Sequence, residues 1–331
     1  MTMSATTPSP NPQTVLPPLE LPWQPVSPRL QLGEGVCWSE DQQAFFGCDI
    51  DGGSVWRLRF DGTKIDGAQF DTVAHFTDPS ACVQTVHGEW LVSARDGIYA
   101  CSADFSQQRL WVPSPFDTAQ ERWNDARIGP DGAFWLMTIY EPRQPPLARL
   151  YRLDGTGVLT PQMQGLTVGN GLNWSADART LLWADTTSHS VYSADFPLES
   201  TADPIDSAAQ SAVLRLPRKT DLPEGQAYGG RPDGCARDET GHFWSACFEG
   251  GQLLRYGLDG AAVQSVPVPV RCPTMPCFGG PDGRTLIVTS ASHKRPADEL
   301  AAHPHSGHVL ACRSAVAGPA PHRFQREHRF F

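Results

Sequence analysis

Apolar and polar positions alternate in short runs along most of the chain, and the runs recur at a nearly constant interval. Each repeat begins with a polar turn, continues with an apolar run that usually contains an aromatic residue, and adds a second turn and a second run. The turns end at positions 41, 88, 132, 177, 241 and 283, which gives spacings of 47, 44, 45, 64 and 42 residues. The apolar runs that follow span residues 44–50, 89–95, 133–139, 180–186, 242–248 and 285–291.

Six repeats of this kind predict six blades of a β-propeller. A period of about 45 residues made only of short strands is typical of four-stranded blades arranged around a central axis. Side chains within the predicted strands alternate at period two, as in residues 190–196, and no segment shows a helical period of comparable strength. We therefore expect an all-β fold in which residues 29–315 form one six-bladed propeller.

Three segments fall outside the regular repeat. Residues 1–28 contain eight prolines and many Ser and Thr residues, which predicts an extended or disordered lead-in. Residues 197–230 fill the one long spacing and are rich in Ser, Ala, Asp and Pro, so we expect an insertion on a loop. Residues 316–331 form a C-terminal tail, and the pattern leaves open whether this tail docks onto the propeller or frays.

Composition narrows the functional class. The chain of 331 residues contains 30 glycines and 30 prolines, which suits many tight turns, and its net charge is −10. An acidic chain without a basic stripe argues against nucleic acid or a membrane surface as a partner. The nine cysteines form no Cys-x-x-Cys pair, and the chain shows no signal peptide and no apolar run that would span a bilayer. We expect a cytoplasmic protein that is monomeric or weakly homo-oligomeric.

Polar residues recur just before the first strand of several blades, and a propeller brings these strand starts together around its central channel. Glu34, Asn170 and Asp233 stand at such starts in blades one, four and five, and each adjoins a glycine that lets the backbone bend. Two carboxylates and an amide carbonyl form a hard oxygen ligand set suited to a divalent cation. The alternative is that these Asn-Gly and Asp-Gly pairs are ordinary turns, since Pro-Asp-Gly also occurs at 130–132 and 281–283.

Five short motifs follow one another in a characteristic order. The chain carries Gly-Glu-Gly-x-x-Trp at 33–38, Arg-Trp-Asn-Asp at 122–125, Gly-Asn-Gly-Leu-x-Trp-Ser at 169–175, Pro-Asp-Gly at 232–234 and Cys-Phe-Gly-Gly at 277–280. This series, which covers roughly residues 30–312, resembles the regucalcin/gluconolactonase (senescence-marker-protein) family. The resemblance implies a six-bladed propeller with a metal site in its channel and metal-dependent hydrolysis of a sugar acid lactone in carbohydrate catabolism.

The resemblance also assigns residues to the site. Matched by position, the metal ligands are Glu34, Asn170 and Asp233, and the substrate contacts are Arg122, Asn124 and Glu141. The implied cofactor is one divalent ion, with calcium, zinc, manganese, magnesium and iron(II) all left open. The implied partner is a small sugar lactone.

A lactone is an activated ester, so a divalent ion that polarises its carbonyl and acidifies a water can open it without a strong protein nucleophile. Asp233 is the candidate catalytic residue, as both ligand and general base, although a carboxylate bound to a cation is a weaker base. Two alternatives remain: a metal-dependent esterase acting on non-sugar lactones or organophosphates, and a calcium-binding or scaffolding propeller without catalysis. The absence of a Gly-x-Ser-x-Gly elbow and of a Walker loop disfavours a serine hydrolase or a nucleotide enzyme.

Overall fold

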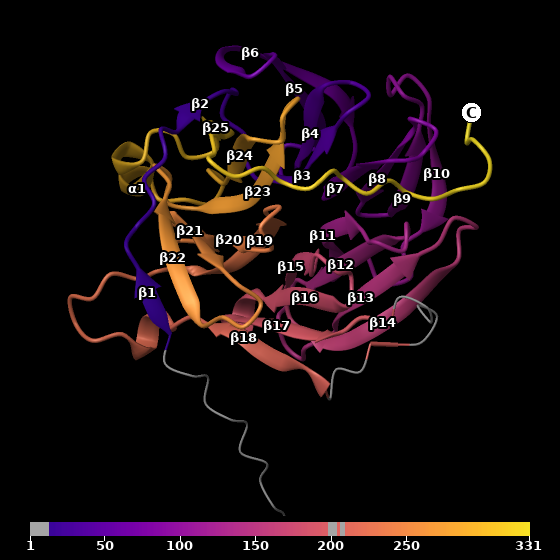
Figure 1. Ribbon diagram of the computed structural model, residues 1–331. Coiled ribbons are helices and arrows are strands. Elements are labelled where there is room, and N and C mark those ends of the chain that lie inside the picture. The colour runs from indigo at the N-terminus through magenta and orange to yellow at the C-terminus, as the bar shows by residue number, and fades with distance from the viewer. Residues whose placement is uncertain (1–12, 198–203, 206–208) are drawn as a thin grey trace, which may run out of the picture.

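Six mainly antiparallel sheets surround a common axis in the computed structural model, which describes residues 13–197, 204–205 and 209–331 (Figure 1). The predicted apolar runs all become the second strands of their sheets, counted from the axis outward. Apart from β1 and β2, the strands of each sheet pair with their neighbours in the chain, and most of these antiparallel pairs are joined by turns of a few residues. The predicted all-β, six-bladed propeller is therefore confirmed.

Each blade contains four or five strands, numbered along the chain and ordered from the axis outward. Blade one contains β3 (Gly33–Ser39), β4 (Ala44–Asp49), β5 (Ser54–Asp61) and β6 (Lys64–His75). Blade two contains β7 (Ala81–Gln84), β8 (Trp90–Ala94), β9 (Gly97–Cys101) and β10 (Gln108–Pro113). Blade three contains β11 (Glu121–Ile128), β12 (Phe134–Tyr140), β13 (Ala148–Leu153) and β14 (Leu159–Leu166).

Blade four contains β15 (Gly169–Trp174), β16 (Thr180–Asp185), β17 (Ser190–Asp195) and β18 (Ser211–Arg215). Blade five contains β19 (Arg231–Arg237), β20 (Phe243–Phe248), β21 (Gln252–Tyr256), β22 (Ala262–Pro267) and β1 (Thr14–Leu16). Blade six contains β23 (Pro273–Gly279), β24 (Thr285–Ser290), β25 (Leu310–Arg313) and β2 (Gln24–Pro25). The described ranges also hold helix α1 (Ala297–Ala302) and the 3-10 helices Thr186–Ser188 and Lys219–Asp221, and none of these helices is long and apolar enough to cross a membrane.

The segment before the propeller supplies strands to two blades. Strand β2 pairs with β25, so residues 24–25 complete blade six and join the start of the chain to its last blade. Strand β1 lies parallel to β22 at the outer edge of blade five. Residues 13–28 of the predicted lead-in therefore contain two paired strands, upstream of the expected propeller start at 29, and residues 1–12 lie outside the described part of the chain.

The predicted loop insertion at 197–230 contains regular structure. Strand β18 lies within it and forms the outermost strand of blade four, with Val191 opposite Leu214. The sequence of β18 shows little alternation of apolar and polar residues, which explains why the hydrophobic pattern did not reveal this strand. Residues 198–203 and 206–208 of this segment lie outside the described residues.

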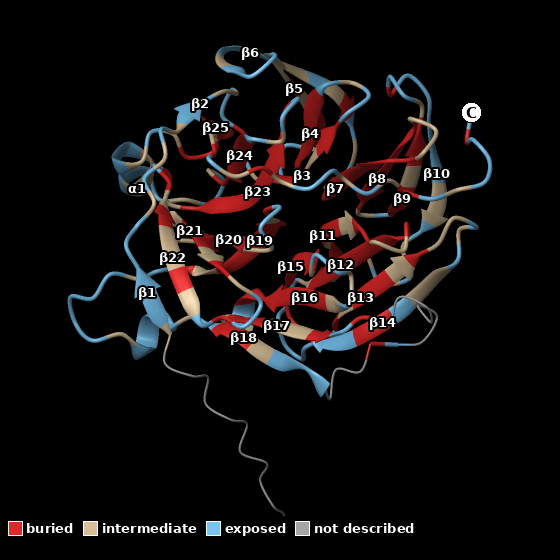
Figure 2. Cartoon of the chain, in the orientation of Figure 1, coloured by how far each residue is buried: buried red, intermediate tan, exposed pale blue. Residues whose placement is uncertain are grey.

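Large aromatic side chains fill the space between neighbouring blades. Trp56, Trp90, Trp135, Trp183 and Trp244 are fully buried and come from second or third strands of their blades. Figure 2 shows buried residues concentrated in the inner strands and exposed ones at the outer edges and loops. The inner strands are thus packed on both faces, which fixes the positions of the side chains that face the axis.

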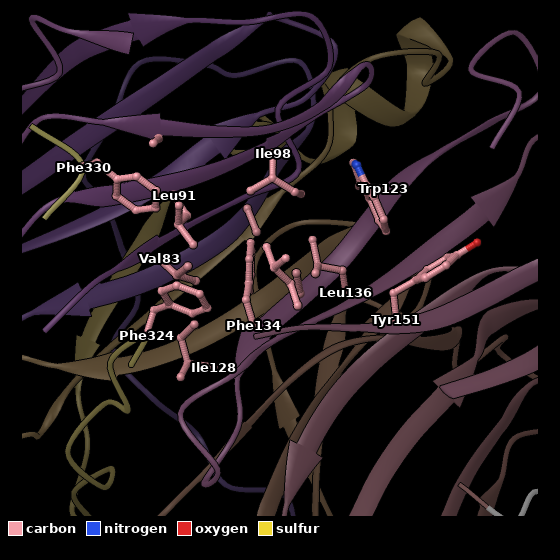
Figure 3. Close-up of a cluster of buried hydrophobic side chains, with 14 residues drawn as sticks. Val83, Leu91, Ile98, Trp123, Ile128, Phe134, Leu136, Tyr151, Phe324 and Phe330 are labelled. Atoms are coloured by element: carbon pink, nitrogen blue, oxygen red, sulfur yellow. The ribbon is translucent and has the colours of Figure 1, made fainter. Parts of the chain in front are cut away.

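The C-terminal tail is docked. Phe324 is fully buried between blades two and three, where it joins Phe134 and Leu91 in one apolar cluster (Figure 3). The Arg323 guanidinium forms two hydrogen bonds with the Asp41 carboxylate at 2.7 and 2.8 Å, in the first turn of blade one. Burial of a phenylalanine and a two-point ion pair hold the tail across one end of the propeller.

Candidate active site in the axial channel

Innermost strands of the propeller carry bulges at matching places. The pairing register shifts in β3, β11, β15, β19 and β23 within a few residues of the strand start. A bulge leaves one or two residues unpaired and re-aims their side chains. Glu34, Asn124, Asn170 and Asp233 lie in or directly beside these bulges, so each is released from the regular alternation of its strand.

Glycine is required next to two of these side chains. Gly35 has φ +55°, and a Cβ atom there would lie 2.2 Å from the Ser80 carbonyl oxygen of blade two. Gly171 has φ +62°, a conformation that side chains disfavour. The Gly-Glu-Gly and Gly-Asn-Gly motifs therefore reflect backbone conformations of the inner strands, and not outer turns.

Three carboxylates lie near one another in the channel, at the level of the bulges. Glu34, Asp125 and Asp233 are 8%, 3% and 7% exposed. Burial first, and then the carboxylates of Asp233 and Asp125, raise the pKa of Glu34 well above its ordinary value. Burial and the Asp125 carboxylate raise the pKa of Asp233 to about 8. When Glu34 and Asp233 are both ionised, their carboxylates repel each other. A cation bound beside them would relieve this repulsion and is therefore strongly favoured.

A chain of hydrogen bonds runs around the channel and fixes the orientation of Asn170. The Asn124 side-chain amide donates to Asn170 Oδ1 at 3.1 Å and to the Gly169 carbonyl at 3.0 Å. Asn170 Nδ2 donates to Thr186 Oγ1 at 2.8 Å, and that hydroxyl donates to the Pro232 carbonyl at 2.8 Å. Because the Nδ2 group is committed to Thr186, Oδ1 is the acceptor end of the Asn170 amide, and it keeps one lone pair beyond the bond from Asn124.

Arg122 is 9% exposed and connects the predicted ligand layer to the predicted substrate contacts. Its Nη1 atom donates to Asn124 Oδ1 at 3.0 Å, and its Nε atom lies 3.7 Å from Glu141. Arg95 binds the two Glu141 oxygens at 2.9 and 3.1 Å and also contacts Asp78. Hydrogen bonds from Arg95 hold the pKa of Glu141 below its ordinary value, so this carboxylate stays ionised beside Arg122.

The donor set fits a divalent metal ion. Glu34 and Asp233 provide anionic oxygens, and Asn170 provides an oriented neutral oxygen, which matches the chemistry of hard cations. Within the described residues, no group of three or more His, Cys, Asp and Glu side chains is arranged as a metal site.

The structure brings all six predicted site residues together, either at the level of Glu34 in the channel or at the channel mouth. Their roles remain predictions. Sequence reasoning missed Asp125, Thr186 and Arg95. Asp125 lies inside the quoted Arg-Trp-Asn-Asp motif, and its Oδ2 atom accepts from the Leu172 backbone N–H at 3.0 Å. Thr186 directly follows the second strand of blade four, and the pairing of Asn170 with Ala184 would have placed it beside Asn170. No sequence signal distinguished Arg95.

Known proteins resemble this chain over nearly its whole length. The sequence matches the SMP-30/Gluconolactonase/LRE-like region over residues 32–292. It is 34% identical over 290 residues to a 6-deoxy-6-sulfogluconolactonase from Pseudomonas putida, covering 87% of this chain and 93% of that protein. It is 26% identical to regucalcin from Gallus gallus, covering 90% and 96%. The crystal structure of a calcium-binding protein, regucalcin, from Agrobacterium tumefaciens superimposes with a TM-score of 0.81 at 22% identity, covering 94% and 99%, which concerns the fold.

Proposed function

Because this chain belongs to the SMP-30/gluconolactonase/LRE-like family, we propose that its axial site hydrolyses a sugar lactone with the help of one divalent metal ion. The observation that carries the proposal is the pair of buried carboxylates, Glu34 and Asp233, whose charges act on each other, together with the oriented Oδ1 atom of Asn170. The 34% identity to a sulfogluconolactonase over most of both chains supports a lactone as the substrate.

Glu34, Asn170 and Asp233 would hold the metal. When bound, the ion supplies Lewis-acid activation of the lactone carbonyl and of water. The two carboxylates leave a divalent ion formally neutral, and the amide adds no charge. Asp125 adds a further buried negative charge close by, and the Arg122 guanidinium partly offsets it.

The chain's own side chains bind the sugar and move the protons. Arg122 Nη2 has no hydrogen bond with any described residue, so it is available to a ring hydroxyl of the substrate, while Nη1 is fixed by Asn124. Glu141 accepts from a second hydroxyl at the mouth. Asp233 takes the proton of the attacking water, the hydroxyl adds to the carbonyl carbon, and the ring ester C–O bond breaks. Asp233 returns that proton to the leaving ring oxygen, and the product is an open-chain hydroxy acid, which then ionises and releases the proton that the assay detects.

A lactone panel assayed by proton release tests the proposal. Metal-free protein is loaded in turn with calcium, zinc, manganese, magnesium or iron(II), and offered glucono-, xylono- and arabinonolactone, a sulfonated gluconolactone and an aryl ester. We expect rapid opening of at least one sugar lactone, only with metal, and little aryl ester hydrolysis. Aryl ester hydrolysis alone would identify an esterase. If no ion speeds any reaction above the buffer rate, the protein is a non-catalytic propeller.

The double role of Asp233 needs its own variant. Asp233→Asn keeps the shape of the side chain and removes its charge and its basicity. We expect weaker metal binding and strongly reduced turnover even at saturating metal. Full metal affinity together with full turnover in this variant would rule out both roles.

A further inference from the structure

Beneath the predicted ligands, the axial channel opens into a cavity of about 190 Å³, which we call the lower chamber. It begins at Gly35, next to Glu34, and follows the inner strands away from the mouth. Residues 319–323 of the docked tail line its far end. Figure 1 shows this tail, in yellow, crossing the face of the propeller in front of the inner strands of blades one and two.

Among the described residues, three arginines and one histidine line the lower chamber, and no acidic side chain does. They are Arg127, Arg237, His322 and Arg323. The remaining wall is mostly apolar and includes Trp38 and Trp174, so charges inside it are poorly screened. In a chain with a net charge of −10, this is an unusual concentration of positive charge.

Two acidic residues near the lower chamber, Asp131 and Asp238, are committed to other partners, and the Asp125 carboxylate of the ligand layer acts on Arg127 electrostatically without a hydrogen bond to it. Asp131 binds Arg152 Nε at 2.8 Å and the Trp135 indole N–H at 3.0 Å. Asp238 binds the Arg255 guanidinium at 3.0 and 3.1 Å. Of the three lining arginines, Arg323 alone forms a two-point ion pair, with Asp41.

Arg127 retains an unsatisfied buried donor, and Arg237 forms only one long hydrogen bond. Arg127 Nη2 donates to the Cys235 carbonyl at 2.7 Å, and its buried Nε atom has no hydrogen-bond partner among the described residues. Arg237 contributes one long hydrogen bond, 3.5 Å, to the carbonyl of Asp238. The neighbouring cations Arg237 and Arg127 add to burial in lowering the pKa of His322. Unpaired guanidinium groups in a confined apolar cavity strongly favour an anionic partner.

We propose that the lower chamber is a binding site for a small oxyanion, such as phosphate, sulfate or a short carboxylate, held between Arg127 and Arg237. Guanidinium donors match the paired oxygens of these groups better than they match a spherical halide. The acidic layer above would exclude the anion from the predicted metal site, so the two halves of the channel select ligands of opposite charge. This site is separate from lactone hydrolysis, and neither proposal depends on the other.

Calorimetry on the metal-free full-length protein tests the site. Inorganic phosphate, sulfate and acetate are titrated at constant ionic strength, with chloride as the reference anion. Metal-free protein is used because the carboxylate layer cannot then attract these anions. We expect one oxyanion to bind with a stoichiometry of one, and Arg237→Gln to weaken it about tenfold or more, since hydrogen bonds to charged groups are strong. The ranking of the three probes identifies the oxyanion class.

Two controls separate this site from other arginines. Arg179→Gln removes an exposed guanidinium from the turn after β15, which borders the same end of the channel without lining the chamber, and it should leave binding unchanged. Arg122→Gln removes a guanidinium at the channel mouth and should also leave oxyanion binding unchanged. Arg127→Gln is a second variant of the lower chamber. Its oxyanion affinity is interpreted only if its thermal unfolding matches that of the wild type. Absence of binding by all three oxyanions, or equal affinity in wild type and Arg237→Gln, would overturn the proposal.

A resonance of His322 gives an independent readout. Arg237, Arg127 and Asp131 are the charged groups that act on this imidazole. An anion bound between the two arginines offsets their repulsion, so the His322 pKa should rise when phosphate is added. A His322 titration that phosphate does not shift would contradict a chamber-bound anion even if binding is seen by calorimetry.

Discussion

Asn124 in blade three donates its side-chain amide to Oδ1 of Asn170 in blade four, at 3.1 Å. On its other side, Asn170 is held by Thr186, whose hydroxyl reaches the carbonyl of the residue before Asp233. One polar chain therefore links three blades at the level of the predicted ligands. It turns an amide, which has two nearly equivalent ends, into an oriented oxygen donor.

Replacing Thr186 by valine should weaken metal binding without touching a ligand. The variant keeps the shape of the side chain and removes the acceptor for Asn170 Nδ2, so the amide can rotate. Partners of metal ligands typically contribute roughly 10–100-fold to affinity, and we expect a loss of that order in calorimetric titrations with the activating metal.

Thr187 offers a matched control for this variant. It is the next residue in the chain, it is exposed, and no described hydrogen bond involves its hydroxyl. Thr187→Val should bind metal like the wild type. Equal affinities for both variants would show that Thr186 does not orient Asn170.

Asn170→Asp should separate metal affinity from catalysis. A third ligand carboxylate retains or strengthens cation binding, but it makes a formally neutral site net negative where the oxyanion forms. We expect turnover to fall roughly tenfold or more, equivalent to at least about 1.4 kcal/mol of barrier. The metal-free variant should also melt at a lower temperature than metal-free wild type, because a further buried carboxylate joins Glu34 and Asp233.

Differential scanning calorimetry with and without metal, beside initial rates, checks this prediction. The reverse pattern, with unchanged turnover and weakened metal binding, would show that Asn170 does not act as a neutral ligand. Asn170→Ala is the reference variant, and it should lose metal affinity outright.

Arg122→Lys should raise KM more than it lowers kcat. Lysine keeps the charge and loses the planar set of donors that reaches Asn124 and Glu141 together. A hydrogen bond to a charged group contributes about 1.5–3 kcal/mol, so KM should increase roughly tenfold or more. Steady-state kinetics on the best lactone of the panel measure both constants.

Arg149→Lys is the control, because Arg149 lies in the same blade and pairs with Glu121 at 3.0 Å. Its substitution should leave KM unchanged. If Arg122→Lys changes KM no more than Arg149→Lys does, Arg122 is structural. Metal affinity measured on both variants shows whether any effect passes through Asn124.

Phe324→Ala should destabilise the propeller through the docked tail. Phe324 is fully buried between blades two and three, and truncation of such a side chain costs about 3–5 kcal/mol. Phe331→Ala should cost little, since Phe331 is 41% exposed. Urea unfolding of both variants makes the comparison, and similar small losses would mean that the tail contributes no packing energy.

The sequence alone determined the architecture and the approximate location of the site. Six apolar runs at regular spacing define second strands, because a half-buried strand must alternate and a blade must repeat to bury its faces. The residues Glu34, Asn170 and Asp233 stood out because glycines beside them mark backbone bends at equivalent places. The position of β18 and the strands before residue 29 carried too little pattern to be recognised.

Only the tertiary structure decided how these side chains meet. Bulges, which arise from pairing between strands, release the site residues from the alternation that sequence patterns report. Thr186 and Arg95 contact residues of other strands or blades, and such contacts leave no local signature. The closed ring likewise decides which charged residues share each half of the channel, since Glu34 meets Asp125 and Asp233 from other blades, and Arg127 meets Arg237 from another blade.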